Sequence, residues 1–158
     1  MKILILLLTM TLGFFNQIAL ASDQNLCANQ IGTCQYYACK EQELGCGPKG
    51  YLLNYGQRFC RKFYDELEMK LTATGSMWIQ EAATCLQEKI EFESRTQDCK
   101  KMRKFAYSSH SNCYSKANFC QLPLEDKVKI IRFLNSELHK FQTQKEGIQV
   151  LFNCFQSK

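Results

Sequence analysis

Cysteine content constrains this chain more than any other feature of its sequence. The 158 residues include ten cysteines, spread along most of the chain: Cys27, Cys34, Cys39, Cys46, Cys60, Cys85, Cys99, Cys113, Cys120 and Cys154. An even number of thiols in an exported chain predicts five disulfides, because an oxidising compartment cross-links thiols that lie close together. Zinc ligation is the alternative, but the first four cysteines lack the close pairs that zinc sites use. We therefore expect no metal ion and no other cofactor, and the pairing stays open at this point.

An apolar segment at the start of the chain predicts export. Met1-Lys2 supplies a positive charge, residues 3–15 are almost wholly apolar, and Ala19-Leu20-Ala21 has the small-x-small pattern that signal peptidase reads. A membrane anchor is the alternative, but Asn16 and Gln17 end the apolar run after about a dozen residues, fewer than the roughly 20 that span a bilayer. We therefore predict a signal peptide that ends at Ala21.

The rest of the chain, residues 22–158, is predicted to form one compact domain. An apolar share of 46%, two prolines and the lack of any low-complexity tract argue against disorder. The net charge of +5 favours an acidic protein partner without demanding nucleic acid. The expected location is extracellular, or periplasmic if the source is a bacterium.

Apolar residues recur at helical spacing, and no strand-like alternation competes with them. A short helix around Cys34 and Tyr37 precedes a turn over residues 45–50. One longer helix, ending near residues 72–75, carries Phe59, Phe63, Leu67 and Leu71 four apart. A second, over residues 76–93, would bury Trp78, Ile79, Ala82, Leu86 and Ile90. A third would begin after Thr96, its predicted N-cap. The side chains of this helix that would face the core are Cys99, Met102, Ala106, His110 and Cys113.

Two further helices are predicted toward the end of the chain. Pro123 suits a first helical turn, where its missing N–H has no partner, and the buried face would hold Val128, Ile131, Leu134 and Leu138. Residues 143–146, Thr-Gln-Lys-Glu, have capping-box form and would open the last helix, with Ile148, Leu151 and Phe152 inside. The predicted fold class is all-α, a compact disulfide-stapled helical domain of about five helices.

One octapeptide and the cysteine spacing are similar to those of a known family. The octapeptide is Cys113-Tyr114-Ser115-Lys116-Ala117-Asn118-Phe119-Cys120, and residues 75–85 with Trp78 and Ile79 form a second match. With the order and gaps of all ten cysteines, these segments resemble stanniocalcin, a family of secreted glycoprotein hormones, over residues 27–154. The resemblance implies a secreted, non-enzymatic signalling or regulatory protein that acts by protein–protein contact, for example by restraining an extracellular protease.

The same resemblance implies a disulfide pairing and shows two departures. The implied pairs are Cys27–Cys39, Cys34–Cys60, Cys46–Cys99, Cys85–Cys113 and Cys120–Cys154. Vertebrate stanniocalcins form disulfide-linked dimers through an additional cysteine in a longer C-terminal part, and this chain has no eleventh cysteine. It also has no Asn-x-Ser/Thr sequon. We therefore expect a monomer or a non-covalent dimer without N-linked glycans.

No catalytic residue is predicted, and the chain is expected not to be an enzyme. The two histidines are His110 and His139, and His110-Ser111 lies near Cys113, where a nucleophile and base could meet. A bridged cysteine cannot act as a nucleophile, and no oxyanion-binding motif is visible. An exported hydrolase stays open as an alternative. So does a lipid-binding helical module of saposin type, which a large dry cavity would identify.

A basic run is the candidate binding surface. It consists of Lys100, Lys101, Arg103 and Lys104, of which the first and the last two share one helix face. Such a face suits a sulfated sugar, an anionic lipid or an acidic protein patch. Basic helix faces are also common where nothing but solvent meets them, and the sequence leaves both interpretations open.

Overall fold

The computed structural model describes residues 26–93, 98–134 and 141–156, and within these ranges the chain contains helices and no β-strand. The α-helices there are α2 (Gln35–Leu44), α3 (Arg58–Lys62), α4 (Ala73–Glu93), α5 (Cys99–Lys116), α6 (Leu124–Phe133) and α7 (Phe141–Gln156). Shorter helical segments are η1 (Ala28–Gln30), η2 (Leu52–Gln57), η3 (Phe63–Leu67), η4 (Glu68–Lys70) and η6 (Phe119–Gln121). The predicted all-α class is confirmed. None of the described helices combines the length and apolar character that a bilayer-spanning segment requires.

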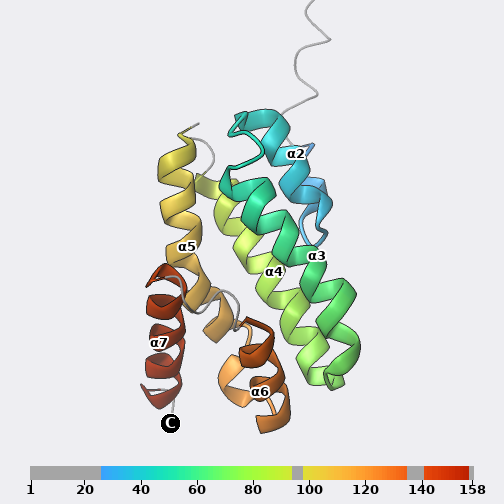
Figure 1. The fold of residues 1–158 in the computed structure, drawn as a ribbon, viewed down its shortest axis with the longest axis vertical. Coiled ribbons are helices and arrows are strands. Elements are labelled where there is room, and N and C mark those ends of the chain that lie inside the picture. The colour runs from blue at the N-terminus through green and yellow to red at the C-terminus, as the bar shows by residue number, and fades with distance from the viewer. Residues whose placement is uncertain (1–25, 94–97, 135–140, 157–158) are drawn as a thin grey trace, which may run out of the picture.

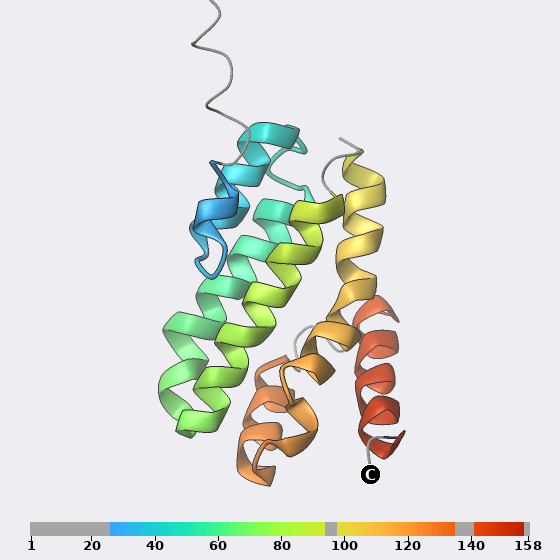
Figure 2. The same ribbon diagram turned by 180° about the vertical axis from the view of Figure 1, so that it is seen from behind.

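The helices pack around α4, as Figure 1 shows. The helical run over residues 52–70 lies along one side of α4, and α5 lies along the other side. Viewed from behind in Figure 2, α7 packs on the outer side of α5, and α6 lies at the lower end of the molecule. This arrangement leaves α7 covered on the side that faces α5 and open on its other side.

Two apolar clusters form most of the core. One, at the α2 end, includes Tyr36, Leu52, Ile90 and Met102, each of which is at most 1% exposed. The other, at the α6 end, is built around Trp78 and includes Leu67, Phe119, Ile130 and Val150. Full burial of one large apolar side chain stabilises a fold by roughly 1.5–3 kcal/mol. Trp78, Ile79, Ala82, Leu86 and Ile90 on α4 are all buried, as the helical period predicts.

The run over residues 52–70 is helical throughout, but it is not a regular α-helix. Its η2 and η3 segments are π-helical, and α3 separates them. Apolar side chains in this run lie four residues apart, from Tyr51 through Tyr55, Phe59 and Phe63 to Leu67. Four residues exceed the 3.6-residue α-helical turn, so the stripe would wind around an ideal α-helix. The wider π turns, which close i→i+5 hydrogen bonds, absorb the excess and keep the stripe on one face.

Five disulfides cross-link the helices. The pairs are Cys27–Cys39, Cys34–Cys60, Cys46–Cys99, Cys85–Cys113 and Cys120–Cys154, the same five that the family resemblance implies. Their Cα–Cα distances of 5.2 to 5.6 Å lie in the usual range for disulfides. Cys85–Cys113 joins α4 to α5, and Cys120–Cys154 ties α7 to η6. Bridges of this number form in an oxidising compartment, which is consistent with an exported chain.

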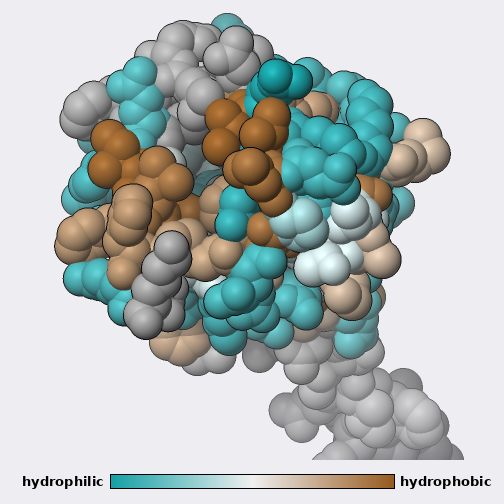
Figure 3. Space-filling view, turned by 90° about the horizontal axis from the view of Figure 1, so that it is seen from below, coloured by the Kyte–Doolittle hydropathy of each residue, from teal (hydrophilic) through white to brown (hydrophobic). Residues whose placement is uncertain are grey.

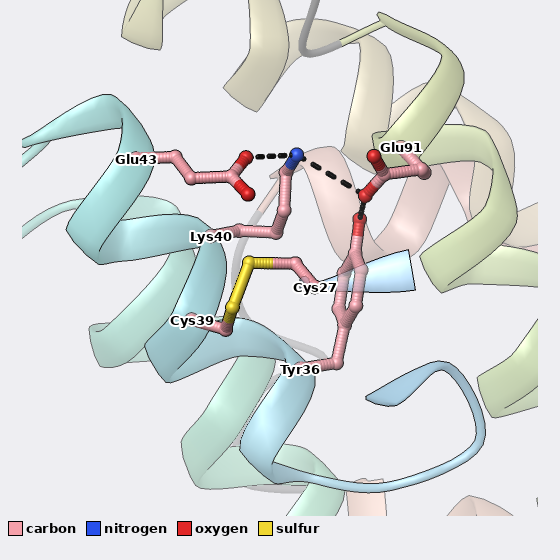
Figure 4. A network of polar contacts seen from close by, with 6 residues as sticks. All are labelled: Cys27, Tyr36, Cys39, Lys40, Glu43 and Glu91. Carbon is pink, nitrogen blue, oxygen red and sulfur yellow. Dashed lines mark hydrogen bonds and ion pairs between the residues drawn. A yellow bond between two sulfur atoms is a disulfide. The ribbon is translucent and has the colours of Figure 1, made fainter. Parts of the chain in front are cut away.

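A buried polar network holds α2 against α4 beside the Cys27–Cys39 disulfide (Figure 4). The Lys40 side chain is 3% exposed and pairs with Glu43 and, at 3.1 Å, with Glu91 of α4. The hydroxyl of Tyr36 donates a hydrogen bond of 3.1 Å to the same Glu91 carboxylate. A buried ammonium is costly unless carboxylates compensate its charge, so this network fixes where α2 sits on α4.

A second polar contact attaches α6 to the start of α4. Asp126 is fully buried, and its carboxylate accepts hydrogen bonds from the backbone N–H of Thr72 at 3.1 Å and from its hydroxyl at 2.5 Å. Gly75 is needed here, because a Cβ at this position would lie 2.7 Å from Oδ2 of Asp126. The contact fixes the first turn of α6, and Ile130 and Ile131 near the other end of the same helix line the candidate site described below.

Several predicted helix boundaries were wrong by two or three residues. α4 begins at Ala73 rather than at residue 76, because Gly75 lies inside its first turn, where it makes room for the Asp126 carboxylate. α7 begins at Phe141, so the residue 143–146 capping box lies within the helix and does not open it. Thr96 lies outside the described residues, and the N-cap of α5 is Asp98, which accepts hydrogen bonds from two backbone N–H groups.

The predicted buried faces of the last two helices were also wrong in part. Ile131, Ile148, Leu151 and Phe152 are exposed, whereas Ile130 and Val150 are buried. Leu138 lies outside the described residues. α7 faces α5 through the side that carries Glu146 and Val150, and its Cys154 is bonded to Cys120. The disulfide and the packing on α5 thus selected a different side of α7 from its most apolar one.

Candidate functional site

A cavity of about 420 Å³ lies at the lower end of the molecule, between α5, α6 and α7. Its buried lining includes Trp78, Phe119, Ile130 and Val150. The exposed residues Ile131, Ile148 and Leu151 also line it, so its rim lies at the molecular surface. Figure 3, a view from below, shows apolar surface on two sides of a hollow at this end.

Helices α4 and α5 and the short helical segment η6 position the aromatic wall of the cavity. Trp78 comes from α4, and its indole Nε1 donates a hydrogen bond of 3.3 Å to the backbone carbonyl of Tyr114 on α5. Its ring lies 5.3 Å from the Tyr114 ring and 5.6 Å from the Phe119 ring, measured between centroids. Phe119 follows the left-handed residue Asn118, whose φ of 64° reverses the chain after α5. These contacts make the wall rigid, because each ring is held from two directions.

His110 is the buried imidazole of this wall. Its Nδ1 lies 3.1 Å from the backbone carbonyl of Tyr107, and because a carbonyl can only accept, Nδ1 carries the proton. The rings of Tyr55, Tyr107 and Tyr114 surround it at centroid distances of 5.5 to 5.9 Å. Burial lowers the pKa of His110, although the hydrogen bond to Tyr107 and the Glu146 carboxylate act in the opposite direction.

Among the described residues that line the cavity, Glu146 is the one acidic side chain. Glu146 of α7 is 8% exposed and lines the cavity, and no lysine or arginine is found among the described lining residues. Burial raises the pKa of the Tyr114 hydroxyl well above its ordinary value, with smaller contributions from Tyr55 and Glu146. The aromatic groups are therefore neutral at physiological pH. The polar groups of the described lining are Glu146, Gln144, His110 and the tyrosine hydroxyls, and the rest of that lining is apolar.

The residues around His110 are not arranged for nucleophilic catalysis. Cys113 forms a disulfide with Cys85. The Ser109 hydroxyl donates to the backbone carbonyl of Phe105 at 2.9 Å, and the Ser115 hydroxyl donates to that of Ser111 at 2.9 Å. Activation of a nucleophile requires its hydroxyl to donate to a base such as an imidazole. These two hydroxyls donate to backbone carbonyls instead.

The basic run lies on a different part of α5. Lys100, Lys101, Arg103 and Lys104 are all exposed. They occupy the first turns of α5, whereas the α5 residues that line the cavity begin at Tyr107. Lys101 forms a 3.8 Å ion pair with the N-cap Asp98, and the Arg103 guanidinium lies 5.8 Å from the Tyr107 ring centroid. The structure thus gathers the four cations on one exposed surface but does not bring them to the cavity.

One group of residues has the spacing of a metal site but not its chemistry. Sulfur atoms of Cys27 and Cys39 and a carboxylate oxygen of Glu43 lie within 4.8 Å of one another. The two sulfurs are joined in a disulfide, so neither is a thiolate, and Glu43 pairs with Lys40. This group therefore cannot supply the anionic ligands that zinc takes.

The sequence predictions missed the cavity and its lining, although signals of both are present. Tyr114 and Phe119 lie within the octapeptide that resembles the stanniocalcin sequence. They contributed only to that resemblance, and the sequence predictions did not include that they line a cavity. Ile148, Leu151, Phe152 and Phe155 follow i, i+3, i+4, i+7 spacing on α7. That pattern identifies an apolar helix side, and it was assigned to the core because most such sides are buried.

Acidification is expected to destabilise the fold through His110. Because burial lowers its pKa in the folded state, the unfolded chain binds a proton below about pH 6.5 that the folded chain does not. The free energy of unfolding should therefore fall as the pH drops through about 6.5 and level off below the lowered folded pKa. Urea midpoints measured at about pH 7.5 and pH 5.5 test this, and the His110→Gln variant should show a flatter pH dependence. Equal pH dependence in both proteins would contradict it.

Comparison with known proteins adds no relative. Neither a family model, nor a curated protein, nor a solved structure matches this chain.

Proposed function

We propose that this chain is an exported, non-enzymatic regulatory protein that acts by binding another extracellular or periplasmic protein. The observation that carries the proposal is the apolar stripe on α7, defined as Ile148, Leu151, Phe152 and Phe155. These side chains are 68%, 52%, 53% and 77% exposed. Large apolar side chains that gather on one exposed helix side mark interaction surfaces, and aromatic residues supply much of the binding energy in protein interfaces.

The stripe is held in place before any partner arrives. α7 packs along α5, and the Cys120–Cys154 bridge fixes it to η6. Asn153 adds a hydrogen bond of 3.0 Å from its side chain to the Ser115 hydroxyl of α5. A surface fixed in this way loses little conformational entropy on association. The partner is expected to present an apolar, helix-sized face that covers Phe152 and Phe155.

The disulfide pattern supports kinship with the stanniocalcin family. All five pairs coincide with those that the sequence resemblance implies. Among the many pairings open to ten cysteines, this coincidence favours a common framework. A hormone-like role through protein contact follows from that kinship and agrees with an exposed apolar stripe. The basic run on α5 is the second contact surface of the proposal, suited to an acidic region of the same partner.

Site-specific cross-linking tests the proposal. A photoreactive phenylalanine analogue replaces Phe152 in one variant and the exposed Met77 of α4 in a matched control, and each oxidised protein is irradiated in extracellular fluid from the source. We expect a covalent adduct with one specific protein from position 152. The adduct should disappear when Phe155→Ser is added. Equal yields of adduct from positions 77 and 152 would show that contact is not specific to the apolar stripe. Adducts between two copies of the chain would show self-association, and either outcome would overturn the proposal.

A further inference from the structure

We propose that the cavity between α5, α6 and α7 is a binding site for the aliphatic tail of an uncharged amphiphile, such as a fatty alcohol or a monoacylglycerol. This function goes beyond protein contact and does not depend on it. Ile148 and Leu151 of the apolar stripe lie at the rim of this cavity, whereas Phe152 and Phe155 do not line it, so cross-linking from Phe152 and ligand binding in the cavity test different residues.

The size of the cavity suits a small molecule. Its volume of about 420 Å³ lies within the range of roughly 300–1,000 Å³ that ligand pockets occupy. A well-packed core contains few voids larger than a water molecule. A second, smaller space of about 50 Å³ lies beside it and shares Tyr55, Trp78, His110 and Tyr114 as lining residues.

The lining is apolar where a tail would lie. Trp78, Phe119, Ile130 and Val150 are buried in the wall, and Ile131 and Leu151 stand at the rim. Each methylene transferred from water to such surroundings contributes about 0.8 kcal/mol. An aliphatic chain is the ligand chemistry that gains most from this wall.

The charges around the cavity decide the headgroup. Glu146 is a buried carboxylate, and the described lining contains no cation that could neutralise a second one. A carboxylate or phosphate headgroup would therefore lose its hydration without a lysine or arginine to compensate its charge. A hydroxyl avoids the cost of desolvating a full charge of either sign. Among the described residues no group forms a hydrogen bond with the hydroxyl of Tyr114, so this phenol is available to an uncharged, hydroxyl-bearing ligand.

The single tryptophan of the chain gives a direct readout. Trp78 is the only tryptophan and lines the cavity, so a ligand that enters the cavity should change its fluorescence. Three probes share a ten-carbon tail and differ only in headgroup charge: decanol, decanoate and decylammonium. At neutral pH and below the solubility limit of each probe, we expect a saturable change of Trp78 emission with decanol. Decanoate should bind at least about tenfold more weakly, because burying an uncompensated carboxylate is costly.

Paired substitutions show whether the ligand lies in the cavity. Val150→Phe fills part of the space, and Gln149→Phe places the same side chain on the adjacent, exposed position of α7 that does not line it. We expect about tenfold weaker decanol binding for Val150→Phe, since the added ring occupies the site of the tail, and unchanged binding for Gln149→Phe. If Val150→Phe lowers the melting temperature strongly, Ile131→Phe at the exposed rim replaces it as the test.

Each outcome supports or overturns the proposal. Saturable decanol binding that Val150→Phe or Ile131→Phe weakens supports it. Failure of decanol to change Trp78 emission, or equal binding in all variants, overturns it. Binding of decanoate or decylammonium as tight as that of decanol would show a charged ligand and overturn it as well. Cross-linking from Phe152 is measured separately from these three results. Failure of amphiphile binding in the cavity is therefore distinguishable from failure of protein binding by the apolar stripe.

Discussion

Replacing Cys46 and Cys99 together with serine is expected to lower the free energy of unfolding by about 4 kcal/mol. This bridge spans 53 residues, the longest separation of the five. In the chain-entropy account, a cross-link stabilises by restricting the unfolded chain, and the effect grows with loop length. The bridge also holds the first turn of α5 to the segment after α2, where Cys46 lies. Denaturant unfolding of the oxidised protein and of the double variant measures the difference.

A matched double variant separates loop length from the loss of any disulfide. Cys27–Cys39 spans only 12 residues, so its removal should cost about 3 kcal/mol by the same relation. Peptide mapping under non-reducing conditions checks that the other four bridges keep their partners in both variants. An equal loss in the two variants, or a larger loss for the shorter loop, would refute the entropic account for this protein.

Trp78→Ala is expected to cost about 3–5 kcal/mol, the range for removing a large aromatic side chain from a core. Trp78 is 2% exposed and packs against the rings of Phe63, Tyr114 and Phe119. The substitution also leaves the Tyr114 carbonyl without the indole donor. Thermal and denaturant unfolding measure the loss. The loss of unfolding free energy for Trp78→Ala should exceed the loss for any substitution on the exposed side of α4.

The adjacent residue provides the control for this substitution. Met77 lies on the same helix and is 54% exposed, so Met77→Ala should change stability by no more than about 0.5 kcal/mol. Trp78→Phe should fall between the two, because it keeps an aromatic ring in the wall and removes the hydrogen bond. Similar losses for Met77→Ala and Trp78→Ala would mean that the Trp78 cluster does not organise the core.

Local periodicity predicted where the helices lie better than it predicted which side of each helix is buried. On α4, the predicted buried residues Trp78, Ile79 and Ile90 are buried, because α4 is flanked on both sides and its whole apolar side is covered. On α7 the same reasoning identified an apolar side correctly but assigned it to the core. Ile148 and Phe152 are exposed there, because the described part of the chain covers α7 only where it faces α5 and η6.

The sequence by itself determined the all-α class, the approximate positions of the helices and the need for an oxidising compartment, because these depend on local spacing and on thiol chemistry. Tertiary structure alone decided which side of α7 is covered and where the helical run over residues 52–70 forms π turns. It also decided that His110, Tyr114 and Glu146 line one cavity. Those features depend on distances between segments far apart in the chain. A residue pattern specifies the apolar side of a helix, but only packing against other helices determines what lies opposite that side.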